Sequence, residues 1–312
     1  MKSAQIKQYG SNDVIEIAQN VSLPVDPSEG KTLIKIRAAG VNPIDWKIRE
    51  GFMEKMMPIQ FPSTIGMDFS GVVEKVGNGV TDLKHGDEVY GQAAITNGGS
   101  GAFAEEALAN AGNVAQKPKN LSYKEAAGLP LVGVSAWQSL IETMRLTQGQ
   151  KILIHGGAGG IGSMAIQLAK HLGAYVTTTV SSNDKKFVKD LGVDEVIDYK
   201  AQKFEDLLHD YDAVFDTIGG ETYKKSFKVL KRGGIIVSML EQPDQGLMEK
   251  FGVKSIMQFT QVNKERLTKL AKWVDQDNIH VNVEKTFPLE DANKALDYQK
   301  EVHPRGKIVL TI

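Results

Sequence analysis

The chain contains no cysteine. This absence excludes disulfides, thiolate zinc sites, iron–sulfur clusters and cysteine nucleophiles, and it fits a reducing compartment. No stretch approaches the roughly 18 uninterrupted apolar residues of a membrane span, and residues 1–12 carry no apolar core of a signal peptide. From these absences we expect a soluble, cytoplasmic protein.

An excess of charge of one sign is also missing. Lys and Arg together number 37 and Asp and Glu 38, which gives a net charge of −1. This balance argues against a nucleic-acid-binding surface and against a polybasic membrane anchor. The chain does have enough apolar material for folded cores, since 41% of its residues are hydrophobic. Its length of 312 residues suggests about two domains.

The two parts of the chain have different patterns. Residues 33–38 and 69–76 are short β-like runs separated by frequent glycine turns, which indicates a β-rich first domain. Beyond residue 122, strands alternate with helices, as in βαβ units around a parallel sheet. In residues 305–312, polar and apolar side chains alternate as they do in a strand, and we expect this segment to rejoin the first domain. The predicted strands of the second part are 151–155, 174–180, 195–198, 213–216 and 235–239. Predicted helices are 163–172 and 264–274. The first predicted domain combines residues 1–122 with residues 263–312, and the second comprises residues 123–262.

A glycine-rich segment follows the predicted strand at 151–155 and leads into the next predicted helix. It contains the pattern G-x-G-x-x-G at Gly157, Gly159 and Gly162. Glycine permits a tight strand-to-helix turn and a close approach of a pyrophosphate, which the N–H groups at the start of the helix then face. A purely structural turn is the alternative. The motif predicts dinucleotide binding by Gly157, Ala158, Gly159, Gly160, Ile161 and Gly162.

The residues after the second predicted strand indicate which dinucleotide binds. An acidic residue there would hold the ribose hydroxyl of NAD, but this chain continues with Ser181, Ser182 and, shortly after, Lys185. Hydroxyl groups and an ammonium suit a 2′-phosphate, so the sequence favours NADPH over NADH. Asp184 counts against this preference unless it caps the following helix, and an ordinary solvated helix face is the alternative for the lysine.

Five motifs recur in a fixed order along the whole chain: residues 39–45 (AGVNPID), 66–73 (GMDFSGVV), 86–91 (GDEVYG), the glycine turn, and 306–309 (GKIV). This order resembles the medium-chain dehydrogenase/reductase superfamily, and most of all its zinc-free quinone oxidoreductase and enone (alkenal) reductase branch. The resemblance implies an α/β fold with a chaperonin-10-like β-rich catalytic domain and a Rossmann domain with a doubly wound parallel sheet. It also implies an active site in the cleft between them, and a homodimer.

Zinc-dependent relatives have a cysteine where this chain has Asn42 and a histidine where it has Met67, so we expect no catalytic zinc. Without that Lewis acid, conjugated acceptors are better substrates than alcohols or aldehydes. The resulting prediction is an NADPH-dependent, flavin-free reductase of quinones or α,β-unsaturated carbonyl compounds. A non-enzymatic, NADPH-binding redox sensor of the same fold is the alternative.

Two residues in or just after the first motif are candidates for the chemistry. Hydride attack on the β-carbon of an enone leaves negative charge on the carbonyl oxygen, which needs a donor or a cation. Lys47 is the leading candidate, because similar enone reductases carry lysine where quinone oxidoreductases often have tyrosine. Asn42 could donate a hydrogen bond to substrate or to the nicotinamide ribose. The alternatives are a solvated lysine and an Asn-Pro turn former.

Several further residues are candidate cofactor contacts. The resemblance places Ser135 near the nicotinamide and Tyr199 near the adenosine phosphate, while a helix-embedded serine and a packed surface tyrosine are the alternatives. Thr217 and Ile218 follow the fourth predicted strand of the parallel sheet, where ligands of open α/β sheets bind. Arg305 and Lys307 flank the last glycine, as phosphate contacts or as surface charges.

Apolar side chains between the first two motifs could line a substrate pocket, although ordinary packing is the favoured interpretation. They are Trp46, Phe52, Met53, Met56 and Met57.

Overall fold

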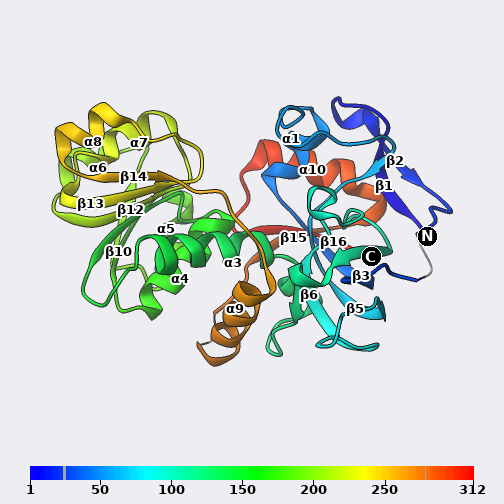
Figure 1. The fold of residues 1–312 in the computed structure, drawn as a ribbon. Helices are drawn as coiled ribbons and strands as arrows, with labels where there is room; N and C mark the ends of the chain where they lie inside the picture. The colour runs from blue at the N-terminus through cyan, green and yellow to red at the C-terminus, as the bar shows by residue number, and fades with distance from the viewer. Residues whose placement is uncertain (24–25, 278) are drawn as a thin grey trace. The chain divides into compact units, whose positions relative to one another are not determined.

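The computed structural model describes residues 1–23, 26–277 and 279–312, and the chain forms two compact units (Figure 1). Unit 1 comprises Met1–Leu131 and Val262–Ile312, and unit 2 comprises Val132–Gln261. The first boundary falls nine residues after the expected residue 122 (131 − 122). The cause is helix α2 (Tyr123–Ala127), which packs on strands of unit 1.

Unit 1 is built on a mostly antiparallel sheet whose strands run in the order β15-β16-β3-β5-β6-β8, with β7 also paired to β3. Only β15 and β16 pair in parallel. The bounds are β3 (Lys31–Val41), β5 (Asp68–Val76), β6 (Glu88–Gln92), β7 (Glu106–Asn110), β8 (Val114–Gln116), β15 (Val283–Pro288) and β16 (Lys307–Thr311). A smaller sheet joins β1 (Ser3–Ile6), β2 (Ile15–Ala18) and β4 (Ser63–Thr64).

The C-terminal segment does rejoin the first unit, as predicted. Strand β16 pairs antiparallel with β3, with Ile308 opposite Val41. The predicted helix at 264–274 is α9 (Lys264–Asp277), and it belongs to unit 1. Leu267 and Leu270 are fully buried, and the backbone oxygen of Leu267 accepts a hydrogen bond from Tyr90 Oη at 2.7 Å.

A short helix, α1 (Pro43–Arg49), follows Asn42 directly after β3. Its first residue is a proline, whose fixed φ suits the start of a helix, and Asp45 Oδ2 accepts a hydrogen bond from the N–H of Asn42 at 2.8 Å. Helix α1 packs beside α10 (Ala292–Val302), where Arg49 forms an ion pair with Asp297 at 3.0 Å. Helix α1 is therefore fixed at both ends.

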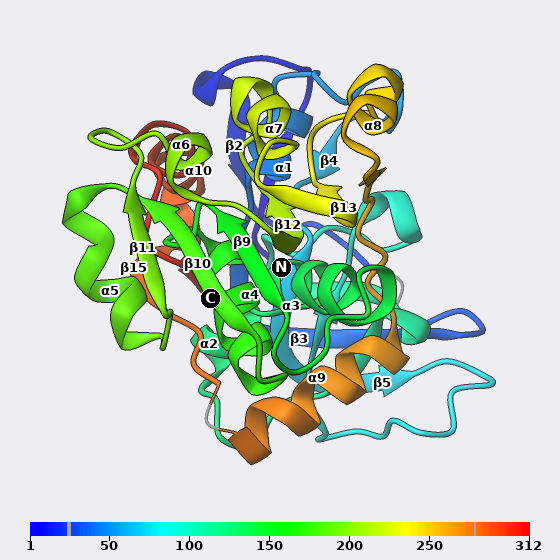
Figure 2. The same ribbon diagram turned by 90° about the vertical axis from the view of Figure 1, so that its left-hand side faces the viewer.

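Unit 2 is a doubly wound parallel sheet, as the family resemblance implied, and its strands run in the order β11-β10-β9-β12-β13-β14. The edge strand β14 (Lys254–Met257) was not among the five predicted strands. The central strand of the sheet carries Ile152, Leu153 and Ile154, which are fully buried because helices cover both faces of the sheet. Figures 1 and 2 show α4 and α5 on one face and α7 and α8 on the other.

The strands of unit 2 are β9 (Lys151–His155), β10 (Tyr175–Val180), β11 (Glu195–Asp198), β12 (Tyr211–Asp216), β13 (Leu230–Ser238) and β14 (Lys254–Met257). The helices are α3 (Pro130–Trp137), which crosses the unit boundary, then α4 (Gly160–His171), α5 (Lys185–Asp190), α6 (Phe204–Leu207), α7 (Gly220–Ser226) and α8 (Gln245–Phe251). Within the described ranges, no helix combines the length and the apolar character that a membrane crossing requires.

His155, at the end of β9, is completely buried in unit 2. Its Nδ1 is 3.0 Å from Thr179 Oγ1 and its Nε2 is 3.0 Å from Ser226 Oγ, and its ring contacts Phe204. Burial lowers the pKa of His155 from 6.5 to about 4, although Asp216 and Glu205 act in the opposite direction. The folded protein therefore keeps this imidazole neutral at a pH where the unfolded chain protonates it.

This difference gives His155 a destabilising contribution in mild acid. Between pH 6.5 and 4 only the unfolded chain binds the proton at His155, and by pH 5 this lowers the free energy of unfolding by about 2 kcal/mol. The buried carboxyl group of Asp45, whose pKa is raised to about 8, acts in the opposite direction over the same range, so the contribution of His155 is measured as a difference. Urea unfolding followed by circular dichroism should show that His155→Asn gains stability relative to the unaltered protein as the pH falls from 6.5 to 5. Equal pH slopes in the two proteins would contradict it.

Candidate active site

The glycine-rich turn between β9 and α4 is shaped by close packing. Gly156 has a φ of 72°, which glycine adopts without strain. A Cβ on Gly157 would lie 2.1 Å from Thr178 Oγ1, and a Cβ on Gly162 would lie 2.2 Å from the backbone oxygen of Gly156. No larger residue fits at either of these two positions.

Gly159 differs from its neighbours. A Cβ built on it would meet no protein atom nearer than 3.5 Å, the backbone oxygen of Gly156. Gly159 is the N-cap of α4, and the first N–H groups of that helix have no partner within the helix. Ala158, Gly160 and Ile161 are partly exposed around it. The turn thus offers open space beside free backbone donors, which fits a pyrophosphate.

The predicted contacts for the adenosine end lie along the carboxyl edge of the parallel sheet. Ser181 follows β10, and its Oγ donates to Asp184 Oδ2 at 2.6 Å. Ser182 follows it in a short 3₁₀ turn. Lys185 Nζ lies 3.3 Å from Asp198 Oδ2. The Tyr199 N–H donates to the backbone oxygen of Val180 at 3.2 Å, and this places the exposed tyrosine beside the serines.

Carboxylates share this edge with the predicted phosphate ligands. The pKa of Asp198 lies below its ordinary value, first because of the Lys200 N–H at 3.1 Å and also because of Lys185. Asp198 is therefore ionised, and it already engages the ammonium that the sequence assigned to a phosphate. A bound 2′-phosphate would have to share Lys185 with Asp198.

Thr217 and Ile218 border the glycine turn itself. Thr217 Oγ1 donates to the backbone oxygen of His155 at 2.8 Å, and Ile218 is 53% exposed. Ser135 lies in α3 and is fully buried, with its Oγ 2.6 Å from Thr260 Oγ1. Arg305 is an exposed residue of unit 1, and its backbone oxygen accepts from Asn282 Nδ2 at 2.7 Å.

Unit 1 contains a buried polar cluster around Asn42. Asn42 Nδ2 donates to Asp68 Oδ2 at 3.0 Å, and Asn42 Oδ1 accepts from Lys307 Nζ. Lys307 Nζ also donates to the backbone oxygen of Val41 at 2.8 Å, and Gln92 Nε2 donates to Asp68 Oδ1 at 2.7 Å. The expectation that Lys307 is a phosphate contact or a surface charge is wrong, because the residue is only 3% exposed.

This cluster contains two carboxyl groups, Asp68 and Asp45, and one ammonium, Lys307. Burial raises the pKa of Asp68 and raises that of Asp45, nearby on α1, to about 8. Burial lowers the pKa of Lys307, while the two carboxyl groups oppose that shift. Water is excluded here, so ionised groups need partners.

Lys47 lies on the same helix but is partly exposed. Its Nζ is 5.6 Å from the centre of the Trp46 ring, and no described residue forms a hydrogen bond or ion pair with it. The Trp46 ring meets that of Phe52 edge to face at 6.0 Å. Phe52 and Met56 are 71% and 65% exposed, so the expectation of ordinary packing is wrong for these two. The Lys47 ammonium, which has no described ion-pair partner, therefore lies near the partly exposed Trp46 ring, which in turn contacts the exposed Phe52.

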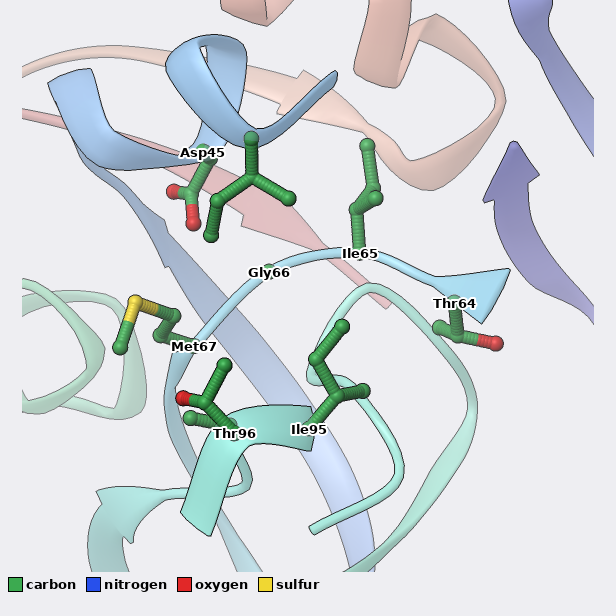
Figure 3. A pocket seen from close by; sticks show the side chains of 9 residues that line it. Asp45, Thr64, Ile65, Gly66, Met67, Ile95 and Thr96 are labelled. Carbon is green, nitrogen blue, oxygen red and sulfur yellow. The ribbon is translucent and has the colours of Figure 1, made fainter. Parts of the chain in front are cut away.

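A small cavity in unit 1 lies between α1, the segment after β4 and a 3₁₀ turn (Ile95–Asn97). Figure 3 shows Asp45 directed into it from the helix, with Met67 and Thr96 on the opposite side. The cavity has room for about one water molecule.

Comparisons with known proteins agree with this architecture. Residues 28–119 match the family described as "Alcohol dehydrogenase GroES-like domain", and residues 191–310 match "Zinc-binding dehydrogenase". A 2-methylene-furan-3-one reductase of Solanum lycopersicum is 38% identical over 99% of this chain and 79% of its own length. An NADPH-dependent alkenal/one oxidoreductase, chloroplastic, of Arabidopsis thaliana is 36% identical with the same coverage. The chain belongs to the medium-chain dehydrogenase/reductase superfamily.

The solved structures lead to the same branch of that superfamily. The quinone oxidoreductase from Coxiella burnetii superposes with a TM-score of 0.91 at 34% identity, covering 100% of this chain and 99% of the other. The predicted combination of a GroES-like unit with a Rossmann unit is confirmed. The family resemblance stated from the five motifs is confirmed as well.

The residues of this medium-chain dehydrogenase/reductase do not fit a catalytic zinc ion. Positions 42 and 67 hold an amide and a thioether, and the oxygen of Asn42 accepts a hydrogen bond from the Lys307 ammonium. Zinc sites use thiolate, imidazole or carboxylate ligands. Within the described ranges, no group of three or more His, Cys, Asp or Glu is arranged to hold a metal ion.

Sequence reasoning missed the part of the site that lies inside unit 1. Asp68, Gln92 and Lys307 come from three different strands, so no local pattern connects them. A signal did exist for Asp45, because Asn-x-x-Asp at the start of a helix resembles a capping box.

Proposed function

We propose that this protein uses NADPH to reduce α,β-unsaturated carbonyl compounds or quinones, without flavin or zinc, and that enones and alkenals are the preferred class. The observation that carries the proposal is Lys47, an ammonium with no described ion-pair partner, which lies 5.6 Å from the ring of the partly exposed Trp46. The two relatives above support this, since both are named for the reduction of conjugated carbonyl compounds or alkenals.

The residues of unit 2 fit NADPH. The glycine turn from Gly157 to Gly162 would receive the pyrophosphate, because the space over Gly159 is open. Ser181, Ser182 and Lys185 would face the 2′-phosphate. When bound, NADPH supplies the hydride that the reduction requires. Further proposed contacts are Tyr199, Thr217, Ile218 and Arg305. Ser135 is fully buried with its hydroxyl beside Thr260, so we assign it to packing below the site and not to contact with the cofactor.

Lys47 would stabilise the charge that forms on the carbonyl oxygen. In an enone, attack on the β-carbon moves an electron pair toward that oxygen, and a nearby ammonium lowers the energy of the resulting anion. Trp46 and Phe52 would contact the apolar part of the substrate. Asn42 is fully buried between Asp68 and Lys307, so we assign it to positioning these groups and not to contact with substrate.

The first test is the initial rate of NADPH oxidation by the purified protein, with a small enone and a benzoquinone offered in parallel. We expect the enone to react faster. A faster quinone reaction would contradict the enone preference and the role of Lys47. Binding of NADPH without turnover of either acceptor would favour the alternative, a non-enzymatic NADPH sensor.

Lys47→Ala tests the charge-stabilising role. We expect kcat/KM for the enone to fall roughly 10²-fold, while the Kd for NADPH stays the same because the ammonium acts only on the substrate. Lys55→Ala, an exposed lysine in the following segment, is the matched control. A change of only a few fold in the Lys47 variant would refute the role.

Lys185→Ala tests the cofactor preference. The Kd for NADPH should rise about 10-fold, the lower range for loss of a charge-assisted hydrogen bond, because Asp198 already shares this ammonium. The Kd for NADH should not change. Lys186→Ala is the control, since Lys186 is 87% exposed and pairs with Asp190. Equal or tighter binding of NADH by the unaltered protein would contradict the site.

The homodimer and the cytoplasmic location are also proposals. The mass of the protein in solution, expected to be twice 34.1 kDa, tests the first. The position of a fluorescently tagged chain in its cell tests the second, and the Arabidopsis relative is chloroplastic by name.

A further inference from the structure

The order of the strands in unit 2 determines where the nicotinamide half of a bound cofactor would extend. Strand β9, which leads into the glycine turn, lies between β10 on one side and β12 on the other (Figure 2). The winding of the sheet reverses between β9 and β12, and ligands of such sheets bind beyond the carboxyl ends of these two strands. The proposed 2′-phosphate site follows β10, and the proposed pyrophosphate site follows β9. The nicotinamide half would therefore extend toward the turn after β12, residues 217–220, here called the β12 turn.

The β12 turn is fixed by hydrogen bonds at its base. Asp216, the last residue of β12, accepts at Oδ1 from the N–H of Ile218 at 3.0 Å and from the N–H of Gly219 at 2.9 Å. Thr217 Oγ1 donates to the backbone oxygen of His155 at 2.8 Å, and His155 directly precedes the glycine turn. The two turns on either side of the reversal point are thus joined to each other.

The hydrogen bonds around Asp216 identify its carboxyl group as ionised. Its second oxygen, Oδ2, accepts from Ser238 Oγ at 2.7 Å. Ser238 Oγ itself accepts from the N–H groups of Leu240 at 3.2 Å and Glu241 at 3.0 Å, so its own hydrogen is available for Asp216. All three described hydrogen-bond partners of Asp216 are therefore donors, and donors stabilise a carboxylate.

The charge of Asp216 is buried and has no cation beside it. Asp216 is fully buried, and no lysine or arginine of the described ranges forms an ion pair with it. Its charge reaches β9, since burial lowers the pKa of His155 and Asp216 opposes that shift. The other carboxylate at the β12 turn, Glu241, accepts from the N–H of Gly220 at 2.7 Å, but it is partly exposed and water screens it.

Hydrogen bonding to the turn does not by itself require this charge. An asparagine at position 216 would still offer an oxygen to the N–H groups of Ile218 and Gly219. A carboxylate in the same place costs more to bury. What the carboxylate adds is a negative potential at the carboxyl end of β12, where little water weakens it.

We propose that Asp216 holds the β12 turn toward the nicotinamide half of the cofactor and that its charge favours the oxidised ring. This inference rests on the proposed function, because it takes NADPH as the hydride donor. The ring is neutral in NADPH and carries one positive charge in NADP⁺, since the hydride takes both electrons of its bond to the acceptor. A fixed negative charge nearby stabilises the positive ring and so favours hydride release. Asp216 acts through the turn and through its field, and it is therefore a positioning residue.

The test is Asp216→Asn, which removes the charge and keeps an acceptor for the turn. The Kd is measured for NADP⁺, for NADPH and for adenosine 2′,5′-bisphosphate, a fragment without the nicotinamide half. We expect the Kd for NADP⁺ to rise about 10-fold more than the Kd for NADPH, because only the oxidised ring carries the charge that Asp216 attracts. The Kd of the fragment should stay within about two-fold, because it binds at a distance from the β12 turn.

Two further variants separate the charge from the hydrogen bonds. Asp212→Asn removes a carboxylate from the opposite end of β12, where Asp212 pairs with Lys231. It is the matched control and should leave the ratio of the Kd values for NADP⁺ and NADPH unchanged. Ser238→Ala removes one hydrogen bond from Asp216 and keeps its charge, so this ratio should again stay the same. A loss that comes only from a loosened turn would affect NADP⁺ and NADPH equally.

Equal weakening of NADP⁺ and NADPH by Asp216→Asn, an equal loss for the fragment, or no change at all would overturn the proposal and leave the proposed function in place. Failure of the unaltered protein to bind NADPH and NADP⁺ would instead refute the proposed function.

An infrared measurement on the unaltered protein tests the charge even if the variant fails to fold. In the difference spectrum between the NADP⁺ and NADPH complexes, we expect a carboxylate band that moves with the charge of the ring. The band should shift when the protein is labelled with ¹³C-aspartate. A difference spectrum without such a band would overturn the inference.

Discussion

The interior of unit 1 depends on one buried ammonium. Lys307 enters from β16, donates to the carbonyl of Val41 at the end of β3, and donates to Asn42 at the start of α1. These bonds join the last strand of the unit to the helix that carries Lys47, and they place a positive charge beside Asp68 and Asp45. A buried charge is tolerated only with partners, so removing one partner leaves the others uncompensated. The cluster therefore fixes where α1 begins.

The NADPH site proposed for unit 2 has a different requirement, the binding of a large anionic ligand by a protein of nearly neutral charge. The backbone provides many of the donors, because the turn after β9 exposes N–H groups and tight packing at Gly157 and Gly162 fixes their direction. Side-chain groups lie at the carboxyl edge of the sheet, where Lys185 forms an ion pair with Asp198. In the proposed NADPH site, affinity for the pyrophosphate and preference for the 2′-phosphate would thus lie on different residues.

Features encoded locally could be predicted from the sequence. The glycine turn, the parallel strands and the return of the C-terminal strand all follow from spacing within short segments, and the structure has them near the expected bounds. Lys307 was misjudged because its neighbours in sequence are typical of a surface turn. Only the pairing of β16 with β3 buries it. Phe52 and Met56 were misjudged for the opposite reason, since apolar residues usually pack but these two remain exposed.

The order of the two units along the chain has a consequence for synthesis. Unit 2 is inserted between Leu131 and Val262, so all of its residues leave the ribosome before Lys307 does. Its parallel sheet can close while unit 1 still lacks β15 and β16. During that interval Asp68 and Asp45 have no ammonium to face, and the half-built sheet has an open edge at β3. Unit 2 can therefore be complete before β15 and β16 arrive to close the unit that holds Lys47.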